Sequence, residues 1–252
     1  MYNKIFLAHH NDNENFIPYD PTLISYDTRN LKLDNKYFSE LSMIDDLLSM
    51  GNLLPDYVGV GHYRRLFQSD FFEKESDSIP PYVFGREYGK DSRPSLPYTK
   101  EYFKMATSNY VLDLNDKDML VLEPFEKSSR KALYTLCDIG WLKKGLVDNF
   151  YIYLKNNLKR EEYDLIYKVS MTEKSHYCNN IMYSSREVFI SYWTFVMRII
   201  KGFAEFMESN RKRKSLITPR CYGYLSEYIM KPVCEDIMGY NIGYKKSICF
   251  EI

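Results

Sequence analysis

The sequence has no long apolar run. None of its stretches approaches the roughly 20 consecutive apolar residues that a membrane-spanning helix needs. Near the start, only Ile5 to Ala8 is continuously apolar, which is shorter than the apolar core of a secretory signal. We therefore expect no spanning helix and no leader. The prediction is a cytoplasmic protein, with association at a membrane surface left open.

Cysteine pairs and common cofactor motifs are also absent. The five cysteines are far apart and include no Cys-x-x-Cys pair, which argues against a disulfide framework and against a cysteine zinc site. Free thiols in a reducing compartment are the simplest interpretation. There is no Walker A loop, no dinucleotide-binding glycine fingerprint and no His-Glu-x-x-His zinc motif, so none of these motif-defined sites is predicted.

Net charge is absent too, because 34 Lys and Arg balance 34 Asp and Glu. A neutral chain has no overall attraction for nucleic acid or an anionic membrane, although a local patch could still act. Hydrophobic residues make up 45% of the chain, which argues against disorder. We expect a single domain over residues 1–252. The 24 Tyr and 15 Phe suit sugar or base stacking, although most should fill the core.

The first part of the chain predicts a strand, a helix and a second strand. Residues 5–8 form a short buried strand, and residues 57–61 form another. Between them, residues 39–50 have apolar positions at helical spacing, with Ser39 as the expected N-cap and Gly51 as the stop. This order favours an α/β sheet with parallel strands.

Polar residues follow both predicted strands. His9 and His10 end the first, and His62 to Arg65 ends the second. Ligands of such sheets gather beyond the carboxyl ends of the strands, and an arginine fork matches phosphate oxygens. The alternative is an internal brace in which one arginine holds Glu40 or Asp56. The residues alone favour neither reading.

The rest of the chain is less regular. Residues 68–100 are predicted as a long loop or lid insertion, and residues 236–252 as a C-terminal extension. The other expected elements are a strand at 117–123, helices at 130–146 and 161–169, a strand at 181–183, a helix at 188–207, a basic interruption at 210–215, a helix at 222–230, and an edge strand or docked extension at 244–252.

Two later clusters carry polar chemistry. In the first, Cys178 stands beside His176, but sequence neighbours rarely have the geometry of a Cys–His hydrolase. His176 could instead bind a sugar, or belong to a plain loop. In the second, Glu227 could act as a general base, or pair with Arg220 to hold a helix; Gly223 allows close backbone approach.

Charged runs give weaker signals. Asp113, Asp116 and Asp118 resemble an acidic metal cluster, but they precede a predicted strand, so a solvated turn is the better interpretation and no metal ligand is assigned. The run from Arg211 to Lys214 is usually a solvated loop, with contact to phosphate or a membrane as the alternative.

Five segments along the chain form a recognisable series of motifs. They are Ser39-Glu40-Leu41, Gly59 through His62-Tyr63-Arg64-Arg65 to Phe67, Asp118 to Pro124, His176 with Asn180, Phe189 and Tyr192, and Arg220 with Gly223 to Glu227. In this order, over residues 1 to about 235, they resemble a family of bacterial glycosyltransferases from capsular and exopolysaccharide gene clusters, long filed as a domain of unknown function. The chain departs from the family pattern at His10, Met43 to Asp46, and Tyr228.

The resemblance implies a GT-A-like α/β fold with a mainly parallel central sheet flanked by helices. It also implies that an acceptor hydroxyl displaces a nucleoside diphosphate from a nucleotide-sugar donor. A metal-independent reaction and one assisted by Mn²⁺ or Mg²⁺ both stay open. The implied roles are catalytic for Glu227, His62 and Glu40, donor-binding for His9, His10, Tyr63, Arg64, Arg65 and Arg220, and acceptor- or sugar-binding for His176, Asn180 and Gly223.

Three functions follow for testing. The leading one is sugar transfer to a glycan or lipid-linked acceptor in surface polysaccharide synthesis. The second is a phage-type enzyme that glycosylates hydroxymethylated bases in DNA; it needs a basic track and a flipped base, and the neutral charge counts against it. The third is a non-catalytic scaffold with the same fold, in which residues 62–65 are only a brace.

Overall fold

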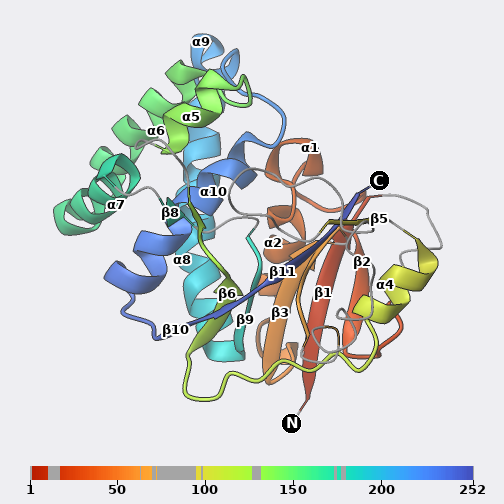
Figure 1. Cartoon of the computed structure of the whole chain (residues 1–252). Coiled ribbons are helices and arrows are strands. Elements are labelled where there is room, and N and C mark those ends of the chain that lie inside the picture. Colours follow the sequence, from red (N-terminus) through yellow and green to blue (C-terminus); the bar gives the residue numbers. More distant parts are fainter. Residues whose placement is uncertain are drawn as a thin grey trace.

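The chain is described here by a computed structural model, shown in Figure 1. The predicted lid at 68–100 lies mostly outside the described residues. The described residues are 2–10, 18–62, 64–69, 72, 95–97, 99–126, 132–172, 175–176 and 180–251.

A mixed sheet forms the centre of the molecule. Its order is β10-β6-β9-β3-β4-β11-β5, and β1 lies between β2 and β3. Among the described strands of this sheet, all run in one direction except β4 and β9. This confirms the predicted α/β class and mainly parallel sheet. The strands are β1 Asn3–His9, β2 Leu23–Asp27, β3 Tyr57–His62, β4 Arg65–Phe67, β5 Ser95–Pro97, β6 Met119–Leu122, β9 Met182–Ser185, β10 Ile242–Lys245 and β11 Ser247–Glu251, with a separate pair of β7 Phe125–Glu126 and β8 Ser175–His176.

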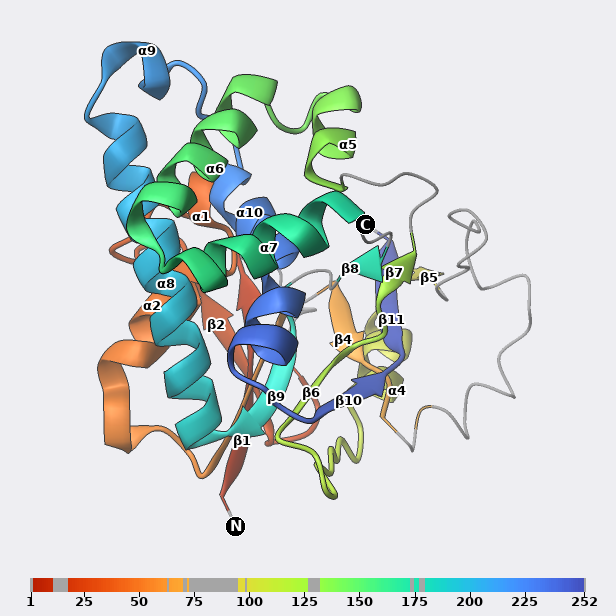
Figure 2. The same ribbon diagram turned by 90° about the vertical axis from the view of Figure 1, so that its left-hand side faces the viewer.

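Helices cover both faces of the sheet. Figures 1 and 2 show α2, α6, α8 and α10 on one side and α4 on the other. The helices are α1 Asn35–Phe38, α2 Leu41–Met50, α4 Lys100–Ala106, α5 Ala132–Asp138, α6 Lys144–Asn157, α7 Arg160–Thr172, α8 Arg186–Glu208, α9 Arg211–Lys214 and α10 Cys221–Lys231, with a 3₁₀ turn at Gly51–Leu53 and a π-helix at Pro232–Ile237.

The alternation of side chains along β1 explains this three-layer arrangement. Phe6 and Ala8 pack into the larger core with α2, α8 and α10, whereas Ile5 and Leu7 pack into the second core with α4. Because β1 is buried on both faces, its sequence is a continuous apolar run and does not alternate between apolar and polar residues. Close packing also explains Gly59 of β3, because a Cβ there would lie 2.7 Å from Cγ1 of Ile5.

Helix α8 is the main support of the larger core. Ser185 caps its first turn by accepting a hydrogen bond from the N–H of Val188 at 3.3 Å. Its inward face includes the fully buried Trp193 and Phe203. The predicted helix at 188–207 is therefore confirmed, as are those at 161–169 and 222–230.

The predicted N-cap of the helix at residues 39–50 is wrong. Ser39 ends the short helix α1 with φ 54°, and α2 begins after Glu40, whose side chain makes no capping hydrogen bond. Two helices therefore meet at a sharp bend where the sequence pattern predicted one helix start. Gly51 does end α2, with φ 53°.

Three other expectations need correction. The predicted helix at 130–146 is split into α5 and α6, with Gly140 at φ 80° in the turn between them. The basic segment at 210–215 forms the short helix α9, which Asn210 caps. At the C-terminus, β11 is not an edge strand, because it pairs with both β4 and β5, while β10 forms the edge beside β6.

Among the described residues, no helix is both long enough and apolar enough to cross a membrane. The described cysteines, Cys137, Cys221, Cys234 and Cys249, are free thiols.

Candidate functional site

A cavity of about 340 Å³ lies at the carboxyl ends of β1 and β3. This is the place where ligands of open α/β sheets collect. The strand ends, the bend between α1 and α2, and the start of α10 all contribute to its wall, at the upper end of the sheet in Figure 1. Its lining residues are Ala8, His10, Thr28, Asn35, Lys36, Ser39, Glu40, His62, Arg64 and Arg220.

The charged lining of this cavity is predominantly cationic. Lys36, Arg64 and Arg220 bring positive charge to it, against the single carboxylate of Glu40. The planar guanidinium of arginine matches the oxygens of a phosphate in geometry. A cleft lined by charges of one sign also attracts ligands of the opposite charge. The cavity therefore suits an anionic group.

Glu40 is the buried carboxylate of the cavity. Its side chain is only 3% exposed, and Nη2 of Arg220 lies 3.5 Å from its Oε1. Arg220 is therefore its ion-pair partner, and hydrogen bonding from Ser39 and from its own backbone also acts on it. Both oxygens are buried, so a ligand hydroxyl or N–H that reached them would add to these contacts.

The charge state of Glu40 follows from its surroundings. Burial acts to raise its pKa, whereas the charge of Arg220 and hydrogen bonds from Ser39 and from its own backbone lower it, and the net pKa is lowered. His62 would add to this lowering only when protonated, and it is neutral near pH 7. Glu40 is therefore an ionised carboxylate.

His62 ends β3 as a buried, neutral imidazole. Burial lowers its pKa to about 3, although Glu40 acts in the opposite direction. The N–H of Arg64 donates to Nδ1 of His62 at 3.2 Å. Because Nδ1 accepts this hydrogen bond, the neutral ring carries its proton on Nε2 and is a donor there. His10 faces the same ring, with centroids 6.4 Å apart.

Arg220 is held in an unusual backbone conformation at the start of α10. Its φ is 59°, in the left-handed region that costs a non-glycine residue energy. Its N–H donates to the carbonyl of Lys36 at 2.7 Å, which ties α10 to α1. Gly223 allows α10 to pack closely against the bend after α1, because a Cβ at this position would lie 3.2 Å from Cβ of Ser39.

The structure brings together a large part of the predicted site. The predicted residues that line the cavity are His10, Glu40, His62, Arg64 and Arg220. They come from the residue after β1, the α1–α2 bend, the end of β3 with the turn after it, and the N-cap of α10, which are segments separated in the sequence.

Other predicted residues lie outside the lining. His9 ends β1 and its carbonyl accepts from the hydroxyl of Thr28 at 2.9 Å, while Arg65 begins β4. Glu227 is buried within α10. Asn180 is also buried: its amide donates to the carbonyl of Gly223, and its Oδ1 accepts from Ser226. In this geometry Asn180 and Gly223 position α10, and neither lines the cavity.

Two predicted residues cannot be placed as side chains. Tyr63 lies outside the described residues. His176 is described only by its backbone, which pairs with Phe125 between β8 and β7.

The sequence reasoning missed Thr28, Asn35 and Lys36. Asn35 and Lys36 lie in α1, where Asp34 caps the first turn by accepting from the N–H of Lys36. An Asp before a helical segment is a recognisable N-cap signal. It could have revealed this short helix just before Glu40, but not that its residues face the strand ends.

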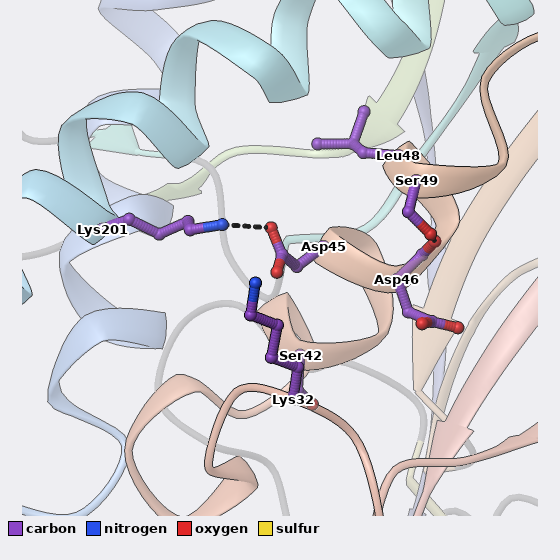
Figure 3. A pocket seen from close by; sticks show the side chains of 7 residues that line it. All are labelled: Lys32, Ser42, Asp45, Asp46, Leu48, Ser49 and Lys201. Carbon is purple, nitrogen blue, oxygen red and sulfur yellow. Dashed lines mark hydrogen bonds and ion pairs between the residues drawn. The ribbon is translucent and has the colours of Figure 1, made fainter.

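A second cavity, of about 390 Å³, lies beside α2 and α8 and is shown in Figure 3. Its wall contains Lys32 and Lys201 against Asp45 and Asp46. Lys201 Nζ lies 2.9 Å from Asp45, and Asp46 accepts a hydrogen bond from the hydroxyl of Tyr26. Its opposite charges balance and its carboxylates already have partners. We therefore interpret this cavity as part of the packing between α2 and α8 and not as a ligand site.

The acidic cluster near β6 makes structural contacts. Asp118 accepts from the N–H of Asn241 at 2.8 Å, and Asp113 accepts from the N–H of Asn115. Within the described part of the chain, no group of three His, Cys, Asp or Glu side chains is placed to hold a metal ion.

Comparison with known proteins agrees with this architecture. The fold is similar to the apo structure of WbbM, described as a bifunctional glycosyltransferase, with a TM-score of 0.63 and 14% identity. The match covers 99% of this chain and 45% of that chain, so this chain spans less than half of WbbM. No curated protein matches. A family model described as a domain of unknown function, DUF4422, matches residues 1–236, in line with the motif resemblance. The chain therefore belongs to the DUF4422 family.

Proposed function

We propose that this chain is a glycosyltransferase that uses a nucleotide-sugar donor. The observation that carries the proposal is the cavity at the ends of β1 and β3, where Lys36, Arg64 and Arg220 surround the buried carboxylate of Glu40. The shared fold with a glycosyltransferase supports it. The motif resemblance supports surface polysaccharide synthesis, with a glycan or lipid-linked acceptor, as its setting.

The cationic side chains fit the departing diphosphate. In the reaction, the acceptor oxygen bonds to the anomeric carbon, and the bond from that carbon to the diphosphate oxygen breaks. The diphosphate leaves with the bonding electrons, so negative charge grows on its oxygens. Arg64 and Arg220 line the cavity and are the residues we assign to stabilise this charge, with Lys36 beside them.

Glu40 is our candidate for the sugar hydroxyls. It is ionised, buried and lines the cavity, whereas Glu227 is buried in α10 outside the lining. Its oxygens can accept hydrogen bonds from a donor or acceptor hydroxyl, and can take the proton that the attacking hydroxyl loses. Nε2–H of His62 provides a neutral donor for a sugar oxygen.

A divalent cation does not fit the described lining. Such ions prefer several oxygen ligands, and Glu40 is the sole carboxylate among the described residues that line this cavity, with Arg220 beside it. The roles proposed here therefore use only side chains of the chain.

Binding of the donor tests the proposal. A ligand that binds only the folded state raises the melting temperature by mass action. We expect one nucleotide class among UDP-, GDP- and dTDP-sugars to raise Tm, and Arg64→Ala to abolish the shift. A CMP-sugar, which would release a monophosphate, should give no shift. Lys201→Ala, in the second cavity, is the matched control and should keep the shift. If no nucleotide-sugar shifts the folded protein, or if Lys201→Ala loses the shift and Arg64→Ala keeps it, the donor site is assigned wrongly.

A further inference from the structure

The longest run of positive charge in the chain forms the short helix α9. Its four residues, Arg211 to Lys214, are all cationic, and Asn210 caps the helix by accepting from the N–H groups of Lys212 at 2.9 Å and Arg213 at 3.3 Å. Arg211, Lys212 and Lys214 are exposed. Among the described residues, none of the four forms an ion pair, so their charge is available to a ligand.

The turn between α5 and α6 packs against the segment that follows α9. Lys143 Nζ donates to the carbonyl of Ser215 at 2.7 Å, and the hydroxyl of Thr218 donates to the carbonyl of Trp141 at 3.1 Å. A carbonyl accepts a hydrogen bond without neutralising the ammonium group, so Lys143 keeps its charge. The turn and α9 therefore form one surface. We call α9 and this turn, residues 139–144, the basic surface.

Two large apolar side chains of the basic surface are open to solvent. Ile139 is 54% exposed and Trp141 is 52% exposed. The indole stacks on Tyr224 with ring centroids 5.3 Å apart, which holds it in place at the surface. Tryptophan is enriched at the boundary between lipid headgroups and acyl chains, and apolar side chains among cations are typical of protein surfaces that lie on a bilayer.

The charge of this region is positive although the whole chain is neutral. Residues 138–148 and 208–218 contain six Lys and Arg but only three Asp and Glu. One of the three carboxylates is engaged in the ion pair between Asp148 and Lys144, at 2.8 Å. Five cations therefore stand against the two remaining carboxylates, which lie at the ends of α5 and α8. Cations clustered in this number attract anionic lipid headgroups.

The basic surface lies at the same end of the molecule as the cavity. Figure 1 shows α5, α9 and α1 on the upper side, toward which β1 and β3 end. Residues 215–219 connect α9 to Arg220, which lines the cavity and whose N–H donates to the carbonyl of Lys36 at 2.7 Å. A bilayer on the basic surface would therefore lie at the end of the sheet that carries the cavity.

A nucleic acid is the other polyanion that such cations attract, and tryptophan can stack on its bases. Ile139 distinguishes the two. An aliphatic side chain offers no flat face for base stacking, whereas it gains free energy on transfer from water to the acyl boundary of a bilayer. An exposed isoleucine beside an exposed tryptophan therefore favours an anionic lipid surface.

We propose that the basic surface docks the protein on an anionic bilayer. The cations of α9 and Lys143 bind the phosphate groups of the lipids, while Ile139 and Trp141 enter the layer between headgroups and acyl chains. Docking does not depend on the proposed glycosyltransferase function. Its use, which is to place the cavity next to a lipid-linked acceptor, rests on that function.

Binding to vesicles tests the proposal with the whole chain. The probes are vesicles of equal parts phosphatidylglycerol and phosphatidylcholine, vesicles of phosphatidylcholine alone, and a single-stranded and a duplex oligonucleotide. We expect the protein to sediment with the anionic vesicles, less so as salt is added, and not with phosphatidylcholine. The emission of Trp141 should shift to the blue on binding; Trp193, the other tryptophan of the chain, is fully buried.

Removal of charge from α9 should weaken binding to anionic vesicles about a hundredfold, because each lysine or arginine near such a surface strengthens binding about fivefold. Arg213 is left in place because its guanidinium carbon lies 3.8 Å from the ring centroid of Phe206. The matched control removes the same charge from the far end of α6, a helix of 14 residues and so about 20 Å long, and should bind normally. The variant is Arg211→Gln with Lys212→Gln and Lys214→Gln, and the control is Lys155→Gln with Lys159→Gln and Arg160→Gln.

A second pair of variants tests the apolar contact. Ile139→Ser should weaken binding to anionic vesicles about fivefold, because less apolar surface leaves water. Ile152→Ser is its matched control: Ile152 lies on α6 outside the basic surface, has a similar exposure of 52%, and should be replaceable without loss of binding. Circular dichroism checks that each variant is folded.

The outcomes are distinct. Failure of the folded protein to bind anionic vesicles overturns the proposal, as does equal binding to both kinds of vesicle, equal loss in a variant and its control, or binding of an oligonucleotide without binding of vesicles. The α9 variant should keep the thermal shift with the nucleotide-sugar. If vesicles bind through the basic surface but no nucleotide-sugar raises Tm, the docking proposal stands and the donor assignment fails.

Discussion

Protonation of His62 should limit the stability of the protein in mild acid. The ring is buried at the end of β3, and burial lowers its pKa to about 3 from the ordinary value of 6.5. Below pH 6.5 the unfolded chain therefore binds a proton at His62 that the folded chain does not bind. Stability that is fully present above pH 6.5 is lost as the pH falls toward 3.

The size of the effect follows from the two pKa values. Each pH unit below 6.5 costs about 1.4 kcal/mol, so lowering the pH from 7.5 to 5 removes about 2 kcal/mol through His62. His62→Asn cannot take up this proton, and its side-chain oxygen can still accept from the N–H of Arg64. The variant should lose about 2 kcal/mol less than the natural protein over this range.

Urea unfolding at a series of pH values measures the difference. Subtracting the two curves removes the carboxylates and other groups that titrate alike in both proteins. His10→Gln is the control: partial desolvation, with Arg64 and Arg220 nearby, also lowers the pKa of His10, but most of this residue is open to solvent, so it should change the slope less. Equal pH slopes for the natural protein and His62→Asn would refute the buried, neutral state of His62.

Three further predictions rest on backbone and packing geometry. Arg220→Gly should be about 1 kcal/mol more stable than Arg220→Ala in urea unfolding, because φ at 59° suits glycine; equal stabilities would contradict the strained backbone. Gly59→Ala should destabilise by about 1–3 kcal/mol, because the new Cβ meets Ile5 at 2.7 Å, whereas Gly61→Ala meets the flexible end of a leucine and should cost less in the same assay. Burial raises the pKa of Cys221 to about 12, so mass mapping after iodoacetamide should find it labelled only in urea; rapid labelling in buffer would contradict its burial.

The elements that were predicted correctly are those whose own residues carry a clear local pattern. β1 and β3 are apolar runs of strand length, and α8 repeats its apolar residues at helical spacing with Ser185 at its start. These signals are local. The break between α5 and α6 is marked only by Ile139-Gly140, and a helix can tolerate a single glycine, so continuity was the simpler prediction.

The strand β11 shows what local pattern cannot reveal. Its residues read as a strand, but its place between β4 and β5 depends on partners that lie more than a hundred residues earlier in the chain. An edge strand and an inserted strand carry similar apolar patterns. Position in the sheet is set by tertiary packing of Ile248 and Phe250 into the second core.

The same distinction applies to the site. His62 and Arg64 stood out because a charged run directly follows a buried strand. The pairing of Glu40 with Arg220 was not foreseen, because each had nearer candidate partners in the sequence. It depends on the bend at Ser39 and on the left-handed backbone of Arg220, which no local signal encodes.

A crystal structure with the nucleotide-sugar that raises Tm most would test the central claim most directly. The account predicts the diphosphate in the cavity at the ends of β1 and β3, within hydrogen-bond distance of Arg64 and Arg220, and a sugar hydroxyl on Glu40. A donor bound elsewhere, for example beside Lys201 and Asp45 in the second cavity, would contradict it.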